Sequence, residues 1–492
     1  MPLSADFYNR LGLSTEATKE EIRKAFYKAA QSLHPDVNIE AGATELFLDV
    51  KEAYETLIDP KKREAYDGKL GEPPKPPVRF RTDFGQEKIP IIHETQLFYA
   101  LIDIDPIPDK IGNDAKSSPP VNLSLVLDCS TSMQGGRINV LKGTAVEIIR
   151  QLREVDILSV TSFNDRAEII LSATNQANDL ENERRIRSLQ TRGGTEIYQG
   201  LKSGYSEIQK NLSPYYVNHL ILVTDGHTYG DEDNCLELAR EAAERNIGIS
   251  CFGIGGKWND TFLESLANIT GGSCYYIREP KDIQIFLREK LNNLGQVLIE
   301  GIKLNFREGP GVQLNYAYRV EPEANVLPLL SPLHLGNISR KDKLSVILEF
   351  MILPIPAQIQ QVLLLEGNLT YNIPENNLIS QRFPVNLVRP TISITEQQSR
   401  PSKKIMEALS HLTLYRMQEE AKKELESGQY QEASFRLQSI GTQLLSQGET
   451  ELADTAFAEA NNIQNNKHYS EENQKRIKYG TQALILPGLT KE

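Results

Sequence analysis

The chain has 492 residues, enough for about three domains of ordinary size, each with its own hydrophobic core. It carries 54 Lys and Arg against 66 Asp and Glu, a formal net charge of −12. This balance argues against nucleic-acid binding, which requires a basic surface. With 39% hydrophobic and 24% charged residues, the composition is typical of a globular protein and not of a disordered chain.

The sequence pattern also argues against membrane insertion and secretion. No stretch reaches the roughly 18 consecutive apolar residues of a transmembrane helix, and the opening MPLSADFYNR lacks the apolar run of a signal peptide. Four cysteines show neither CxxC pairs nor zinc-ligand spacing: Cys129, Cys235, Cys251 and Cys274. We therefore expect a cytoplasmic protein with reduced thiols and no structural zinc.

Residues 1–69 have the pattern of a small helical domain. Apolar side chains recur at helical spacing over residues 22–33, and Thr18 with Glu21 forms a capping box before them. This helix is expected to end before Pro35, because proline disfavours the helical conformation of the residue that precedes it. A second amphipathic helix and a short charged helix, PKKREAYDG, follow, and two such helices can bury a small core between them.

This block, IRKAFYKAAQSLHPDV followed by KEAYETLIDPKKREAYDG, closely resembles the DnaJ-type J-domain. In that family the loop between the helices and a basic helix face bind a DnaK-type chaperone and stimulate its ATPase. The resemblance assigns the loop to His34, Pro35 and Asp36, and the basic face to Arg23, Lys24 and Lys28. A basic face steers association with an acidic partner surface. The Gly/Phe-rich segment and CxxCxGxG repeats of full-length DnaJ chaperones are absent from the sequence, which indicates a specialised J-domain protein.

Residues 70–90 contain the proline-dense segment LGEPPKPPVRF, and we expect them to form a semi-rigid linker. Residues 91–118 follow, with one or more leading strands in IIHETQLFYALIDID and a loop in DKIGNDAKSSPP. The leading strand has no strand partner near it in the sequence.

Residues 119–296 alternate strands and helices in a regular way. The predicted strands are Asn122–Leu127, Ile157–Phe163, Glu168–Leu171, Val217–Thr224, Gly248–Gly253 and Ser273–Ile277, with helices near 137–152, 178–190, 196–210, 233–246, 259–268 and 281–294. Strands such as LSLVLD and HLILVTD are continuous apolar runs, as a sheet covered on both faces requires. The pattern predicts a doubly wound, Rossmann-like α/β domain.

Polar residues follow the central strands of this block, at the sheet edge where such folds place their binding sites. Hydroxyl and carboxylate side chains occur there in three separate segments: Asp128, Ser130, Ser132, Thr195 and Asp225. Hard oxygen donors of this kind suit an octahedral divalent cation, and Mg²⁺ is the expected metal because it often binds through few carboxylates. Because the protein supplies few charges, an acidic group of a partner can complete the coordination.

The same block closely resembles the von Willebrand factor A domain and its metal-ion-dependent adhesion site. Asp128, Ser130 and Ser132 match the family's DxSxS element, while Thr195 and Asp225 match its loop threonine and second aspartate. Caps at strand-to-helix turns are the alternative interpretation of these residues. A catalytic role is disfavoured, because no His or Cys base stands at a matching position to activate Ser130.

Residues 297–395 change to alternating and β-branched runs separated by turns rich in Pro, Gly and Asn, which predicts an antiparallel β-sandwich. We expect the strand LFYALIDID to pair with this later sheet, so that the A domain is an insertion in the sandwich. Residues 399–482 return to helical periodicity. Their Gly428, Tyr430 and Ala433 faintly resemble a tetratricopeptide hairpin, but a small helical bundle packed on the sandwich is the preferred interpretation.

These features together predict a non-enzymatic co-chaperone. Its J-domain would recruit and stimulate a DnaK-type ATPase, and its Mg²⁺-dependent A domain would hold a client or scaffold protein through a carboxylate. A scaffold or adaptor for a ring ATPase, with the J-domain secondary, is the alternative, and a hydrolase comes third.

Overall fold

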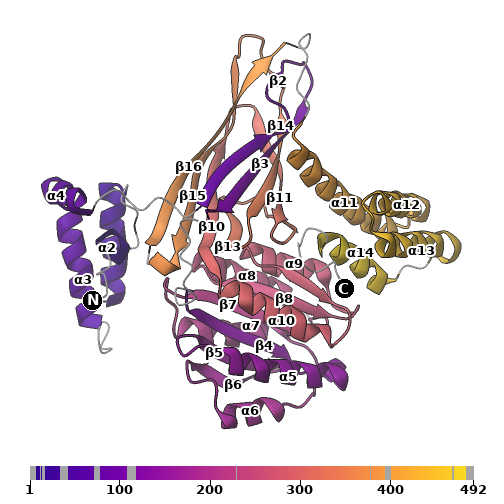
Figure 1. Ribbon diagram of the computed structural model, residues 1–492, viewed down its shortest axis with the longest axis horizontal. Helices are drawn as coiled ribbons and strands as arrows, with labels where there is room; N and C mark the ends of the chain where they lie inside the picture. Colours follow the sequence, from indigo (N-terminus) through magenta and orange to yellow (C-terminus); the bar gives the residue numbers. More distant parts are fainter. Residues whose placement is uncertain are drawn as a thin grey trace.

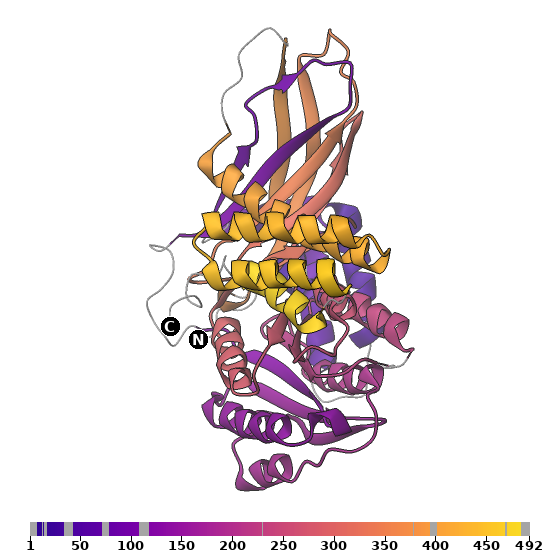
Figure 2. The same ribbon diagram turned by 90° about the vertical axis from the view of Figure 1, so that its right-hand side faces the viewer.

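A computed structural model gives the fold of the chain, which consists of a helical N-terminal domain, a β-sandwich, an α/β domain and C-terminal helices (Figures 1 and 2). This architecture confirms the predicted fold class. The structure describes residues 7–11, 13, 17–33, 43–70, 78–107, 118–228, 230–376, 378–393, 401–467 and 470–483.

Four helices form the N-terminal domain: α1 (Phe7–Arg10), α2 (Lys19–Leu33), α3 (Ala43–Leu57) and α4 (Pro60–Leu70). They share a core of buried apolar side chains: Tyr8, Leu11, Ala17, Ile22, Val50, Ala53 and Leu57. The predicted capping box is confirmed, because the backbone N–H of Thr18 donates to Glu21 Oε2 at 2.8 Å and that of Glu21 donates to Thr18 Oγ1 at 3.3 Å. The domain lies beside the sandwich, where Arg382 forms an ion pair with Glu21 at 3.3 Å.

Two five-stranded sheets form the sandwich. In spatial order, one sheet contains β1 (Val78–Phe84), β3 (Gln96–Pro106), β14 (Leu344–Ile352), β11 (Val312–Glu321) and β12 (Asn325–Val326), and the other contains β13 (Leu333–Ser339), β10 (Val297–Glu308), β15 (Gln361–Ile373), β16 (Leu378–Ile392) and β2 (Ile89–Pro90). β3 pairs with β14 in antiparallel register from Gln96 opposite Ile352 to Ile104 opposite Leu344. The predicted pairing of the leading strand is therefore confirmed, and the α/β domain is inserted between β3 and β10.

The linker predicted for residues 70–90 is wrong over its second half. β1 occupies residues 78–84 and pairs with β3, while β2 pairs with the end of β16. Only residues 73–77 are proline-dense, and the VRFRTDF that follows places Val78 in the sandwich core with Phe80 and Phe84 packed against it. An edge strand of this kind was hidden by the prolines immediately before it, since proline is tolerated at strand edges and strand starts.

The inserted domain has one six-stranded sheet between two helical layers. The strand order is β6 (Ala167–Thr174), β5 (Ile157–Phe163), β4 (Val121–Asp128), β7 (Val217–Thr224), β8 (Gly248–Ile254) and β9 (Cys274–Ile277), and only β6 runs antiparallel to its neighbour. One face packs on α5 (Gly136–Gln151), α6 (Leu180–Arg187) and α10 (Asp282–Leu294), and the other on α7 (Ile197–Gln209), α8 (Glu232–Glu244) and α9 (Asp260–Ile269). Every residue of β4 and β7 is buried, which explains their continuous apolar runs.

A buried arginine joins the inserted domain to the sandwich. Arg319 of β11 is 2% exposed, and its guanidinium donates to both sides of the junction. On the α/β side it reaches the carbonyl oxygens of Gly271 at 2.8 Å and Gly272 at 2.9 Å. On the sandwich side it reaches those of Leu335 at 3.0 Å and Glu323 at 2.9 Å. The planar fork of an arginine satisfies several acceptors in a fixed geometry, so this contact sets the relative orientation of the two domains.

The C-terminal helices are α11 (Lys403–Glu426), α12 (Tyr430–Ser446), α13 (Thr450–Asn466) and α14 (Glu471–Ala483). As predicted, they form a bundle that packs on the sandwich, where Ile405, Ala408 and Leu412 of α11 share a core with its strands. The bundle also contacts the inserted domain. Tyr479 of α14 packs against Trp258, with ring centroids 5.6 Å apart.

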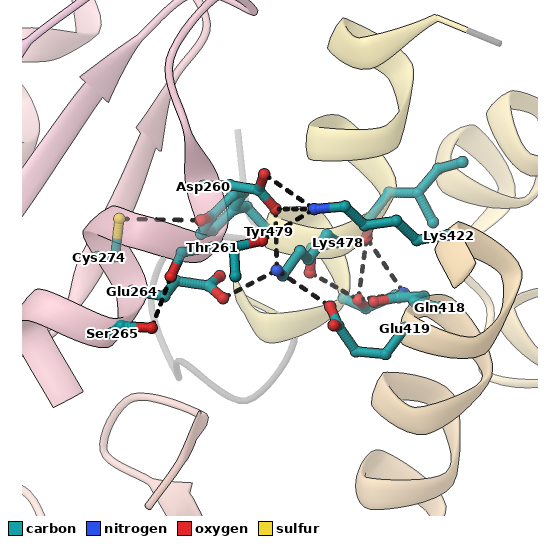
Figure 3. A network of polar contacts seen from close by, with 12 residues as sticks. Asp260, Thr261, Glu264, Ser265, Cys274, Gln418, Glu419, Lys422, Lys478 and Tyr479 are labelled. Atoms are coloured by element: carbon teal, nitrogen blue, oxygen red, sulfur yellow. Dashed lines mark hydrogen bonds and ion pairs between the residues drawn. The ribbon is translucent and has the colours of Figure 1, made fainter. Parts of the chain in front are cut away.

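A charged network reinforces this second contact (Figure 3). Lys478 of α14 is 3% exposed, and its Nζ lies 2.8 Å from Glu264, 3.1 Å from Asp260 and 3.1 Å from Glu419. Lys422 of α11 adds a second ammonium 3.2 Å from Asp260. The ion pairs thus connect α9 of the inserted domain to two different helices of the bundle.

Among the helices that the structure describes, none combines the length and apolarity needed to cross a bilayer.

We predict that Lys478→Met loosens this contact at a cost of about 3 kcal/mol, because the buried Glu264 then loses its counter-charge and Asp260 keeps only Lys422. The chain has a single tryptophan, Trp258, which reports on the interface directly. Urea unfolding followed by its fluorescence should show a lower midpoint in the variant. Lys423→Met, which removes an exposed lysine of α11, is the matched control, and equal midpoints for the two variants would contradict the prediction.

Candidate functional site

The candidate site lies where the central strand β4 ends. β4 is flanked by β5 on one side and β7 on the other. The chain runs from β4 to β5 and later crosses back from β6 to β7, so the strand order reverses at β4. Ligands bind at such switch points in open α/β sheets, because the loops separate there and leave a crevice. Asp128 is the last residue of β4, and Asp225 directly follows β7.

Hydrogen bonds connect four of the five predicted residues. The backbone N–H of Ser130 donates to Asp128 Oδ1 at 2.8 Å, which holds the turn after β4. The hydroxyl oxygens of Ser130 and Ser132 lie 2.9 Å apart, and Ser132 Oγ donates to Asp225 Oδ1 at 2.6 Å. Thr224, which is not one of the predicted residues, donates to Asp128 Oδ2 at 2.6 Å. Two strand ends and one loop therefore converge on a single polar cluster.

Thr195 reaches the same cluster from the loop between α6 and α7. Backbone hydrogen bonds hold this loop against the turn that follows β4, from Arg192 N–H to the Cys129 carbonyl at 2.8 Å and from Thr131 N–H to the Gly193 carbonyl at 3.2 Å. A β-carbon at Gly226, the residue after Asp225, would lie 3.1 Å from Thr195 Oγ1. The structure therefore brings all five predicted residues to one edge of the sheet.

Burial controls the ionisation of two groups at this edge. It raises the pKa of Asp128 to about 6, an effect opposed by the hydrogen bonds from Thr224 and Ser130. Burial likewise raises the pKa of Cys129 to about 12, so this residue is a neutral thiol at physiological pH. A neutral thiol is a poor nucleophile, which agrees with the interpretation of Cys129 as a small buried side chain.

Arg137 is a member of the cluster that the sequence analysis missed. Its guanidinium forms an ion pair with Asp225 Oδ2 and donates to the carbonyl oxygen of Ser132 at 3.3 Å. It occupies the first turn of α5, where the helix dipole disfavours a cation. The sequence signal that could have identified Arg137 is this unfavourable position, because a cation in the first turn of a helix suggests a specific acidic partner.

The side chains of the cluster, two carboxylates and three hydroxyls, match the donor chemistry of a hard divalent cation. Within the described residues no group of three or more His, Cys, Asp and Glu side chains is arranged for metal binding, and this cluster has only two of that kind. The guanidinium of Arg137 balances the negative charge of Asp225. Asp128, in contrast, contacts only neutral hydrogen-bond donors, Thr224 and the Ser130 N–H.

The residues predicted to bind a chaperone are described only in part. Arg23, Lys24 and Lys28 are exposed on α2. His34, Pro35 and Asp36 lie outside the described residues.

Comparisons with known proteins identify three domains. Family profiles match residues 6–67 as a DnaJ domain, residues 122–289 as a von Willebrand factor type A domain, and residues 403–487 as an "Sll0103-like, C-terminal alpha-helical domain". The chain therefore contains a J-domain and an A domain. The first 64-residue match is to the chaperone protein DnaJ of Streptococcus agalactiae, at 52% identity over 13% of this chain and 17% of that chaperone.

Solved structures confirm the fold of the larger part. The von Willebrand factor type A protein from Catenulispora acidiphila has a TM-score of 0.66 at 14% identity, covering 84% of this chain and 98% of its own. The ArnB paralog VWA2 from Sulfolobus acidocaldarius has a TM-score of 0.51 at 13% identity, covering 83% and 98%.

A curated relative matches across most of its length. The "Uncharacterized protein sll0103" of Synechocystis is 30% identical over 387 residues, which is 75% of this chain and 89% of that protein. The chain therefore belongs to the same family as sll0103, with a J-domain and a von Willebrand factor type A domain.

Proposed function

We propose that this protein is a non-catalytic co-chaperone with two binding functions. Its J-domain recruits a DnaK-type chaperone through His34, Pro35 and Asp36 and stimulates the ATPase of that chaperone. Its A domain holds a client or scaffold protein through Mg²⁺ at an adhesion-type site made of Asp128, Ser130, Ser132, Thr195 and Asp225. Tethering then raises the effective concentration of the client near the chaperone.

The observation that carries this proposal is the polar cluster at the end of β4. Its two carboxylates and three hydroxyls come from three separate segments, yet hydrogen bonds and close packing bring them together at the switch point of the sheet. If these side chains were only caps of strand-to-helix turns, they would bond to nearby backbone groups. Ser132 bonds to the side chain of Asp225, which lies 93 residues further along the chain. When Mg²⁺ is bound, it supplies a Lewis-acidic position for a partner's carboxylate.

The charge on α2 supports the J-domain part of the proposal. Arg23, Lys24 and Lys28 are exposed, while Glu21 of the same helix is engaged by Arg382 of the sandwich. Arg23 and Lys24 therefore lie on a solvent-exposed face of α2, where they can meet an acidic partner surface.

We predict that the full-length protein accelerates ATP hydrolysis by its cognate DnaK-type chaperone and that His34→Gln abolishes the acceleration. Arg23→Glu should weaken it, and more strongly at low salt, because that substitution reverses a steering charge. Steady-state ATPase assays measure both effects.

Asp128→Ala is the matched control for this assay, because it alters the A domain and should leave the acceleration unchanged. No acceleration by the intact protein would contradict the co-chaperone function. It would favour the alternative, a scaffold or ring-ATPase adaptor in which the J-domain is secondary.

Arg137 gives a direct test of metal binding. In EDTA, Arg137→Met should lower the free energy of unfolding by about 2 kcal/mol, because the buried Asp225 loses its counter-charge. Saturating Mg²⁺ should reduce this loss, because the metal supplies the missing positive charge. Urea unfolding of both proteins, each with EDTA and with Mg²⁺, completes the thermodynamic cycle.

Two control variants sharpen this cycle. Arg137→Lys keeps the charge and should lose less stability, while Arg166→Met removes an exposed arginine of the same domain and should respond equally in both buffers. A loss that is identical with and without Mg²⁺ would mean that the metal does not bind at this cluster.

Partner capture tests the adhesion function itself. Proteins retained by the immobilised full-length chain in Mg²⁺ should be lost in EDTA and lost with Asp128→Ala, because both changes remove a metal ligand or the metal. They should be retained by His34→Gln, which separates them from the chaperone. A set of partners indifferent to EDTA and to Asp128→Ala would contradict metal-dependent binding.

A further inference from the structure

The loop that joins β8 to α9 connects the polar cluster to the C-terminal bundle. We call its residues 255–259 the β8–α9 loop. It follows β8, the neighbour of β7 in the sheet, and lies between Arg137 on one side and α14 on the other. α14 belongs to the C-terminal bundle, which takes part in neither of the two proposed binding functions.

Lys475 of α14 holds this loop from the side of the bundle. It is 4% exposed, and its Nζ donates to the carbonyl oxygens of Gly256 and, at 2.7 Å, of Trp258. The same ammonium lies 4.9 Å from the centroid of the Trp258 ring, which is a cation–π contact. Burying a cation is costly unless it is hydrogen-bonded, so these contacts keep Lys475 and the loop together.

Trp258 packs between β8 and α14. It is 1% exposed, and its indole N–H donates to the carbonyl oxygen of Gly255 at 2.7 Å. A β-carbon at Gly253 of β8 would lie 2.0 Å from Cε2 of this indole, so only glycine leaves room for it. The indole also packs on Tyr479 of α14. The loop and α14 therefore share a buried aromatic contact in addition to the hydrogen bonds of Lys475.

Arg137 packs against the other side of the loop. A β-carbon at Gly255 would lie 3.1 Å from Arg137 Nη2, so the guanidinium fits closely against the backbone there. Its other terminal nitrogen, Nη1, contacts Asp225 and the carbonyl oxygen of Ser132. The guanidinium thus lies between the loop and the polar cluster, and the loop limits its movement away from Asp225.

Arg137 and a bound metal ion would compete for Asp225. Two cations that approach the same carboxylate repel each other, and this repulsion is poorly screened at a buried group. Asp225 is 1% exposed. A contact that keeps Arg137 on Asp225 therefore weakens metal binding at the cluster.

From these contacts we propose that α14 lowers the metal affinity of the A domain, an inference that rests on the metal site of the proposed function. Lys475 is a positioning residue: it holds the β8–α9 loop, and the loop holds Arg137 on Asp225. A partner that draws α14 away from the loop releases Arg137 and strengthens Mg²⁺ binding. By thermodynamic linkage, Mg²⁺ binding weakens the contact of α14 by the same factor.

Isothermal titration of the full-length protein with Mg²⁺ at constant ionic strength measures this effect. Lys475→Met should bind Mg²⁺ about fivefold more tightly than the wild type, at the lower end of typical coupling between sites. Lys475→Arg keeps the charge and the N–H donors and should bind as the wild type does. In Arg137→Met, the addition of Lys475→Met should not change the affinity, because the group that it releases is absent.

Lys257→Met is the matched control, because Lys257 is an exposed lysine of the same loop and its loss removes the same charge. It should bind Mg²⁺ as the wild type does. The single tryptophan gives a second measurement that needs no change at Lys475. Saturating Mg²⁺ should shift the emission of Trp258 to longer wavelength, because loosening of α14 admits water to the indole, and Arg137→Met should abolish the shift.

The outcomes separate the role of α14 from the metal site itself. If the wild type binds Mg²⁺ but Lys475→Met binds it equally or more weakly, or if Mg²⁺ leaves the Trp258 emission unchanged, the role of α14 is overturned and the metal site stands. A wild type that does not bind Mg²⁺ would overturn the metal site and the role of α14 with it.

Discussion

The arrangement of the domains depends on a buried cation at the point where one domain is inserted into another. The chain enters the A domain after β3 and returns to the sandwich at β10. Arg319 joins the A domain to the sandwich by donating hydrogen bonds to backbone carbonyls of both. Its acceptors are backbone carbonyls and one hydroxyl, so the contact specifies geometry without a carboxylate partner. The contacts of Arg319 lie at the N-terminal end of the parallel sheet, and the polar cluster lies at the opposite end.

The C-terminal helices limit motion in a different way. α11 shares an apolar core with the sandwich, whereas Lys478 and Lys422 connect the bundle to the A domain through carboxylates. One helical unit thus spans both domains and adds a third connection to the two chain crossings. In the proposed co-chaperone these connections would limit where a tethered client can reach, and effective concentration depends on that reach.

Local patterns predicted the polar cluster, because each of its elements is short and tied to a strand end. Asp128 and Asp225 follow buried apolar strands, and parallel strands end at a common edge, so their proximity follows from the fold class. Arg137 escaped this reasoning, because a charged residue in a helix is usually solvent-facing. The strand at residues 78–84 was missed for a similar reason: its partner β3 was recognised as a strand, but the prolines before it suggested a linker.

The sequence alone determined the fold class and the two recognisable domains, because periodicity and motif spacing are local properties of the chain. It only suggested the pairing of the leading strand with the later sheet, which the register of β3 with β14 confirms. Only the tertiary structure decided which charges are buried together. The ion pairs of Arg137 with Asp225 and of Lys478 with its carboxylates join segments that lie far apart in the chain. Burial and electrostatic pairing depend on distances across the fold, which no local pattern encodes.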